Sequence, residues 1–90
     1  MDFLHFDIGQ SSTGDVAVVS LDHQACVRLM DHRNFELYRS GQNYRAIRLW
    51  AQTSPARLRV PQPGHWHVVV DLDGRTGWIG AGVNVARRAA

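Results

Sequence analysis

The sequence predicts a mainly β protein: a small antiparallel β-sandwich of about seven strands, with one short helix near residues 32–39. Two observations support this prediction. Apolar and polar residues alternate along most of the chain, which is the period of a β-strand. Short clusters rich in Gly, Pro, Asp and Ser separate these stretches, and they leave no room for the helical crossovers of a parallel sheet.

The alternation places the expected strands at residues 3–8, 16–21, 26–31, around 47–49, 56–60, 65–72 and 78–85. The strand over 65–72 has the clearest pattern, with His65, His67, Val69 and Asp71 on one face and larger apolar residues on the other. The residues with the same inward period form the predicted core: Leu4, Phe6, Val27, Leu29, Leu58, Val60, Trp66, Val68, Val70, Ile79, Ala81 and Val83.

The helix is predicted where the period of two breaks. Asp31 can accept hydrogen bonds from the first free amides of a helix, and Gly41 can end it in a left-handed conformation. Phe35 and Tyr38 are three residues apart, so both lie on one side of this helix.

Length and composition indicate one domain of 90 residues: a β-sandwich over 1–86, followed by a short C-terminal tail over 87–90. No apolar run approaches the roughly 20 residues of a membrane helix, and the start does not resemble a signal peptide. We therefore expect a cytoplasmic protein without membrane contact. Cys26 is the single cysteine and is expected to be a small buried or half-buried residue.

All ten positively charged residues are arginines, and the net charge is +2. Arginine suits recognition of phosphate or carboxylate groups, because its planar guanidinium donates two hydrogen bonds at once. Codon bias in a GC-rich genome is the alternative explanation. The net charge is too small to indicate a nucleic-acid-binding protein.

His65 and His67 have the spacing of two metal ligands on one face of a strand. A third ligand would have to come from His5, Asp71 or Asp7, and the alternative is a pair of solvent-facing histidines. Because no third ligand is evident, we expect no cofactor and no tightly bound metal.

Strand register suggests a different binding face. If the turn at 61–64 closes a hairpin, Arg59 lies opposite His67, and a second hairpin sets glycines beside them. The sequence-predicted binding residues on this outer face are Arg57, Arg59, His67, Trp78, Gly80 and Gly82. We expect this face to recognise an anionic group; a solvated face with glycines at bulges is the alternative.

Several stretches together resemble a bacterial family known as domain of unknown function 1883. The most specific is Pro63–Leu72; the others are Phe3–Gly9, Val27–Asp31, Asn34-Phe35, Tyr38 and Ser54-Pro55. The stretch Ala46–Leu49 departs from the family's pattern. The resemblance implies a short β-rich protein without an established activity, and some relatives are joined to TIR signalling domains.

The sequence therefore favours a non-catalytic module that binds or senses an unknown ligand or protein partner, with a homodimer as an open alternative. A small metal-dependent enzyme using His65 and His67 is the second hypothesis. An arginine-based nucleic-acid binder is the third, although we do not expect nucleic acid as a partner.

Overall fold

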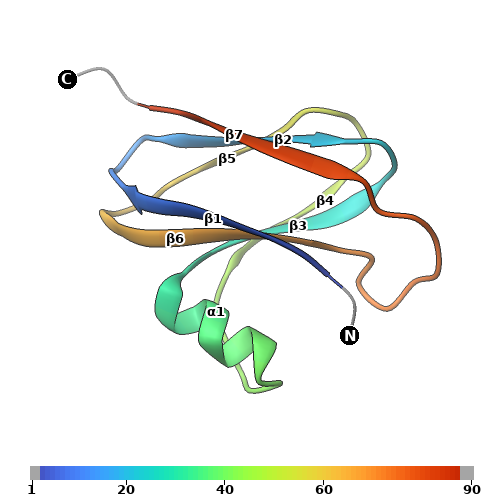
Figure 1. Cartoon of the computed structure of the whole chain (residues 1–90), viewed down its shortest axis with the longest axis horizontal. Helices are drawn as coiled ribbons and strands as arrows, with labels where there is room; N and C mark the ends of the chain where they lie inside the picture. Colours follow the sequence, from blue (N-terminus) through green and yellow to red (C-terminus); the bar gives the residue numbers. More distant parts are fainter. Residues whose placement is uncertain (1–2, 88–90) are drawn as a thin grey trace.

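Two antiparallel sheets form the part of the chain that the computed structural model describes, residues 3–87. One sheet has four strands in the order β1-β6-β3-β4, and the other has three in the order β5-β2-β7 (Figure 1). The predicted fold class, mainly β with one short helix, is confirmed. The elements are β1 (Leu4–Ser11), β2 (Val16–Leu21), β3 (Ala25–Asp31), α1 (His32–Arg39), β4 (Ile47–Ala51), β5 (Ala56–Arg59), β6 (Gly64–Asp71) and β7 (Ala81–Ala86).

The core lies between the two sheets and follows the predicted period. Seven predicted core residues are buried: Val27, Leu29, Leu58, Val60, Trp66, Val68 and Val70. The other five are partly buried and pack against this cluster: Leu4, Phe6, Ile79, Ala81 and Val83. The partly buried residues come from β1, from β7 and from the segment before β7. They therefore mark one open side of the sandwich.

The two predicted hairpins are wrong. β5 pairs with β2, whereas β6 pairs with β1 and β3, so the turn at 61–64 crosses from one sheet to the other. Pro61 and Pro63 have no N–H to donate to a ladder, which disfavours a tight hairpin there. Val60 instead stays with the three-stranded sheet, because its N–H donates to Asp15 O, just before β2, at 2.8 Å. β7 likewise leaves β6 and pairs with β2.

Helix α1 covers the outer face of the four-stranded sheet, over β3 and β6 (Figure 1). As predicted, the Asp31 carboxylate caps it by accepting from Asn34 N at 2.9 Å. Phe35 and Tyr38 are buried against the sheet with Met30 and Val69. The helix gives way to a turn in which Gly41 has a φ of 77°, a conformation that glycine adopts without strain. No helix among residues 3–87 is long and apolar enough to span a membrane.

Residue 87 was predicted to begin a tail, and its side chain is held in place by β1. The Arg87 guanidinium donates to Ile8 O at 3.1 Å and Gln10 O at 3.2 Å, and also to Ser11 Oγ and Asp15 Oδ2. Residues 88–90 lie outside the described residues. Cys26 is buried, and burial raises the pKa of its thiol, so the interpretation of Cys26 as a buried structural residue is confirmed.

Candidate metal centre

The sequence-predicted binding residues do not form one surface. Arg57, Arg59 and Gly82 lie on the exposed outer face of the three-stranded sheet. His67 lies in the other sheet and is buried, with 2% exposure. The register argument that joined these residues is therefore wrong, for the reason given above for the hairpins. Trp78 is 81% exposed in the segment between β6 and β7.

Gly80 lies beside a different residue, Asp22, whose Oδ1 accepts from its N–H at 2.7 Å. Asp22 Oδ1 also lies 3.2 Å from Nδ1 of the neighbouring His23. Whether Arg57, Arg59 and Gly82 bind an anion on their own face stays a prediction.

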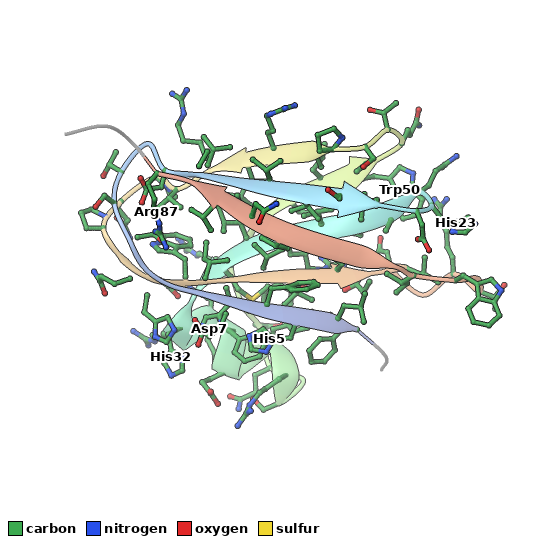
Figure 2. All side chains as sticks on the ribbon, turned by 45° about the horizontal axis from the view of Figure 1, so that its top comes forward. His5, Asp7, His23, His32, Trp50 and Arg87 are labelled. Atoms are coloured by element: carbon green, nitrogen blue, oxygen red, sulfur yellow. The ribbon has the colours of Figure 1, made fainter. Side chains whose placement is uncertain are left out.

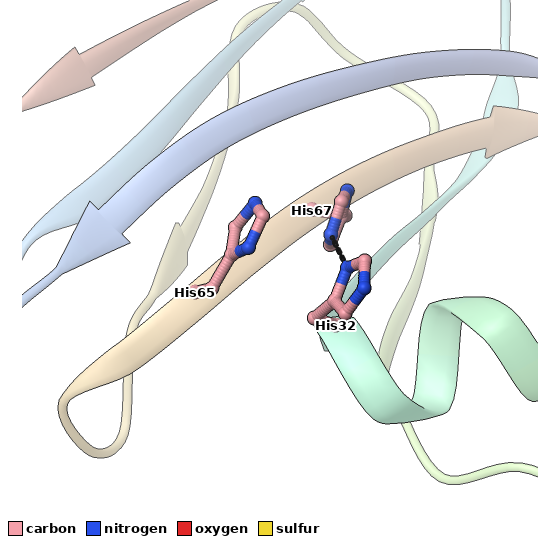
Figure 3. Close-up of side chains that lie close together, drawn as sticks. All are labelled: His32, His65 and His67. Atoms are coloured by element: carbon pink, nitrogen blue, oxygen red, sulfur yellow. Dashed lines mark hydrogen bonds between the residues drawn. The ribbon is translucent and has the colours of Figure 1, made fainter.

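Histidine side chains from three elements gather on the outer face of the four-stranded sheet. His65 and His67 come from β6, with the shared orientation that the sequence predicted, and His5 comes from the neighbouring strand β1. His32 is the first residue of α1 and follows β3, the other neighbour of β6. Figure 2 shows His5 and His32 on the same side of the molecule, with Asp7, and Figure 3 shows His32, His65 and His67 close together.

His67 is the centre of this histidine cluster. Its Nδ1 lies 2.7 Å from His5 Nε2, and its Nε2 lies 3.0 Å from His32 Nδ1. Two imidazole nitrogens at such distances share one proton, so one donates and the other accepts. A neutral His67 carries a single N–H. It therefore donates to one neighbour and accepts from the other, which couples the tautomers of all three rings.

Burial keeps His67 in the neutral form that binds metals. Burial is the largest cause that lowers the pKa of His67 to about 4; the charge of Asp7 acts in the opposite direction, and the nearby histidines act in the same direction as burial. Burial also lowers the pKa of His5. The imidazoles of His67 and His5 are stacked against the Phe35 ring, at 4.5 Å and 4.0 Å between centroids. At neutral pH these two rings have lone pairs available and need no proton loss before coordination.

One ring nitrogen from each of His32, His65 and His67 lies within 4.8 Å of the other two. A tetrahedral zinc ion with ligands at 2.0–2.1 Å separates its nitrogens by about 3.3 Å. The pair His32 Nδ1 and His67 Nε2 is already near that separation. The side chains of His32 and His65 are 53% and 41% exposed, so small rotations can close the remaining gap.

A second partner lies near the other nitrogen of each ring, at hydrogen-bond distance for His65 and His67. Asp7 Oδ1 accepts from His65 Nε2 at 2.7 Å, which leaves Nδ1 of His65 as the ligand atom. Glu36 Oε1 lies 3.9 Å from His32 Nε2. A proton on His67 Nδ1 can be donated to His5, which frees Nε2. Metal-bound histidines commonly have such a partner on the second nitrogen, because it fixes the tautomer and the ring orientation.

A bulge in β1 brings Asp7 to His65. The pairing of β1 with β6 shifts between Asp7 and Gly9, where Gly9 has a φ of 73°. Asp7 Oδ1 also accepts from Gly9 N at 2.8 Å. The hydrogen bond from His65 is the largest cause of the lowered pKa of Asp7, so this carboxylate stays charged at neutral pH.

Sequence reasoning missed His32 and named three other candidates for the third ligand. His5 contacts His67 and Asp7 contacts His65, but both occupy nitrogens on the side away from a shared ion. Asp71 instead forms a buried ion pair with Arg28. The reason for expecting no metal, the lack of a third ligand, therefore does not hold. The reading of both histidines as solvent-facing is wrong for His67.

Fold and site together define a small β-sandwich with a partly buried histidine cluster on one sheet. The chain belongs to the family described as domain of unknown function (DUF1883), whose model matches residues 1–89. No curated protein and no solved structure matches the chain significantly. The resemblance stated from the sequence is confirmed.

Proposed function

We propose that this chain is a metal-binding module that holds one first-row transition-metal ion, with zinc as the reference case, through His32, His65 and His67. The observation that carries the proposal is the convergence of three ring nitrogens within 4.8 Å, drawn from two elements. Imidazole is a ligand suited to Zn, Cu, Ni and Fe. Such a site binds copper more tightly than zinc or nickel. Affinity alone does not select the ion in a cell, so the availability of each metal helps to decide which one is bound.

The coordination would be incomplete without a further ligand. Three histidines leave one position of a tetrahedron, and the exposure of His32 and His65 turns that position toward solvent. Water or a small anion can occupy it, which suits the binding or sensing role expected from the sequence. Catalytic zinc sites also have three protein ligands and an open position, so the metal-dependent enzyme is our second proposal.

The test is metal titration of untagged protein after chelation. We expect one Co²⁺ or Zn²⁺ per chain, with visible Co²⁺ absorption typical of a tetrahedral site. His32→Ala should weaken the binding at least 100-fold, because it removes an exposed ligand while leaving the buried His67 in place. Zinc at 100 times its dissociation constant should add about 2.7 kcal/mol to the free energy of unfolding of the parent.

His23→Ala is the matched control. His23 is exposed to a similar degree and lies at the other end of the molecule (Figure 2), with Asp22 as its partner. We expect its metal affinity to equal that of the parent. The proposal fails if His32→Ala and His65→Ala both bind the metal as tightly as the parent, or if His23→Ala loses as much affinity as they do.

A further inference from the structure

A buried ion pair lies at the other end of helix α1 from His32. Arg28, whose side chain is 6% exposed, donates from Nε to Asp71 Oδ2 at 3.0 Å and from Nη2 to Asp71 Oδ1 at 3.3 Å. Tyr38 Oη donates to the same carboxylate at 2.6 Å. Asp71 is itself almost fully buried. These contacts make Asp71 the permanent partner of Arg28.

A second carboxylate in the same place is held differently. Asp73 bridges two arginines, with Oδ1 3.0 Å from Arg28 Nη2 and Oδ2 3.0 Å from Arg48 Nη2. Its side chain is 41% exposed, and that of Arg48 is 58% exposed. The Asp73–Arg48 pair is exposed, and such pairs contribute only about 0–1 kcal/mol to stability, so this contact is lost at small cost. The contact of Asp73 with the buried Arg28 has to be replaced by the group that enters.

The backbone at Asp73 also favours exchange. Its φ of 51° makes it the one residue other than glycine with a positive φ in the described part of the chain. That conformation is uncommon for a residue with a side chain, although Asp and Asn tolerate it best. The turn therefore holds Asp73 against the arginines in a backbone conformation of higher energy.

Arg28, Arg48 and Asp73 line a cavity of about 670 Å³. Its wall includes Tyr38 and Tyr44, whose rings are perpendicular at 5.0 Å. Arg28 Nη1 donates to no group of residues 3–87, yet no buried side-chain nitrogen or oxygen there lacks a partner. This nitrogen must therefore be reached by solvent, and the cavity that Arg28 lines provides the access.

The charge balance indicates what the cavity accepts. Arg28 and Arg48 supply two positive charges, and the buried Asp71 neutralises one of them. One positive charge is left, which Asp73 neutralises from its exposed position. A carboxylate or phosphate can replace Asp73 without changing this balance, and two guanidinium groups facing one oxyanion are suited to it.

We propose that the cavity between Arg28, Arg48 and the two tyrosines binds a small molecule bearing a carboxylate or phosphate, and that Asp73 occupies the place of this group in the free protein. Arg28 Nη1 and the freed Nη2 groups donate to the oxyanion. The tyrosine rings contact the body of the molecule. This site is separate from the histidine cluster, so either proposal can fail alone.

The test measures binding of inorganic phosphate and, separately, benzoate by NMR, at constant ionic strength, on protein from which metal has been removed beforehand by chelation and dialysis. Asp73→Asn keeps the backbone conformation but removes the competing charge, and we expect it to bind at least one of the two probes at least tenfold more tightly than the parent. Arg48→Gln added to this variant should abolish the gain. The probe with the larger gain identifies the preferred oxyanion.

Two substitutions control for charge alone. Asp22→Asn makes the same change in net charge at a carboxylate outside the lining of the cavity, and Arg57→Gln removes an exposed arginine from the other sheet. Asp22→Asn should bind the probes as the parent does. Arg57→Gln, added to Asp73→Asn, should leave the gain intact. The proposal is overturned if Asp73→Asn binds both probes no more tightly than the parent. It is also overturned if Asp22→Asn reproduces the gain or if the gain survives Arg48→Gln.

Discussion

The outer faces of the two sheets follow the same alternating sequence pattern but have opposite environments. β7, in the three-stranded sheet, alternates between half-buried and exposed residues, as an uncovered strand does. β6, in the four-stranded sheet, is buried on both faces from Trp66 to Asp71. Helix α1 makes the difference, because it covers β6 and β3 and nothing equivalent covers β7 among residues 3–87 (Figure 1).

Polar groups beneath the helix differ in pKa and in ion pairing from polar groups on the uncovered sheet. Under the helix, burial lowers the pKa of His67, and Asp71 and Arg28 form an ion pair away from water. On the uncovered sheet, Arg57 and Arg59 project into solvent, where charges are screened. The candidate sites therefore lie on the covered sheet, beside or beneath α1.

The largest difference in stability between the two faces is expected for a substitution of Asp71. Asp71→Ala leaves Arg28 buried with only the exposed Asp73, and breaking a buried pair in this way costs about 3–5 kcal/mol. Arg59→Ala, on the uncovered face, should change the free energy of unfolding by less than about 0.5 kcal/mol. Urea unfolding of both variants measures the difference.

Tyr38→Phe is a milder variant in case Asp71→Ala does not fold. It removes one hydrogen bond to the Asp71 carboxylate and should cost about 1.5–3 kcal/mol. If Tyr38→Phe were as stable as the parent, the buried hydrogen bonds among Arg28, Tyr38 and Asp71 would have no special role in stability.

A smaller effect is expected from pH in the metal-free protein. The pKa of His67 falls from 6.5 to about 4 on folding, because the ring is buried. Between these values the unfolded chain binds a proton that the folded chain does not, so stability falls as the pH decreases from 6.5 to 4. The slope from this one group is at most about 1.4 kcal/mol per pH unit.

His67→Gln should reduce that slope, as measured by urea unfolding at several pH values. His5, Asp7 and Asp71, whose pKa values are also lowered in the folded protein, contribute to the part of the slope that stays. An unchanged slope in His67→Gln would contradict the assignment of this proton to His67.

The smallest effect belongs to the uncovered face. A Cβ added at Gly82 meets no atom within 4 Å, and its φ is not in the left-handed region. Because valine favours strands more than glycine does, we expect Gly82→Val to stabilise the fold by less than about 1 kcal/mol. A loss above 1 kcal/mol in thermal unfolding would mean that this face packs against another part of the molecule.

The sequence was sufficient to predict the strands, the helix and the faces of β6, because burial imposes the period of two directly on residues such as Val68 and Val70. It was insufficient for the pairing of strands, since the same period fits any partner with an apolar face. His32 was missed for this reason. Its neighbour Asp31 pairs with Trp66, between His65 and His67, but nothing in the sequence says that β3 lies beside β6.

The bonds of Arg87 have a consequence for the exposed edge of β1. An edge strand presents free carbonyls and amides to which a strand of another molecule can add. Here the guanidinium at the end of β7 occupies the carbonyls of Ile8 and Gln10. Arg87 thus leaves fewer free carbonyls at the end of the first strand for pairing with a strand of another molecule.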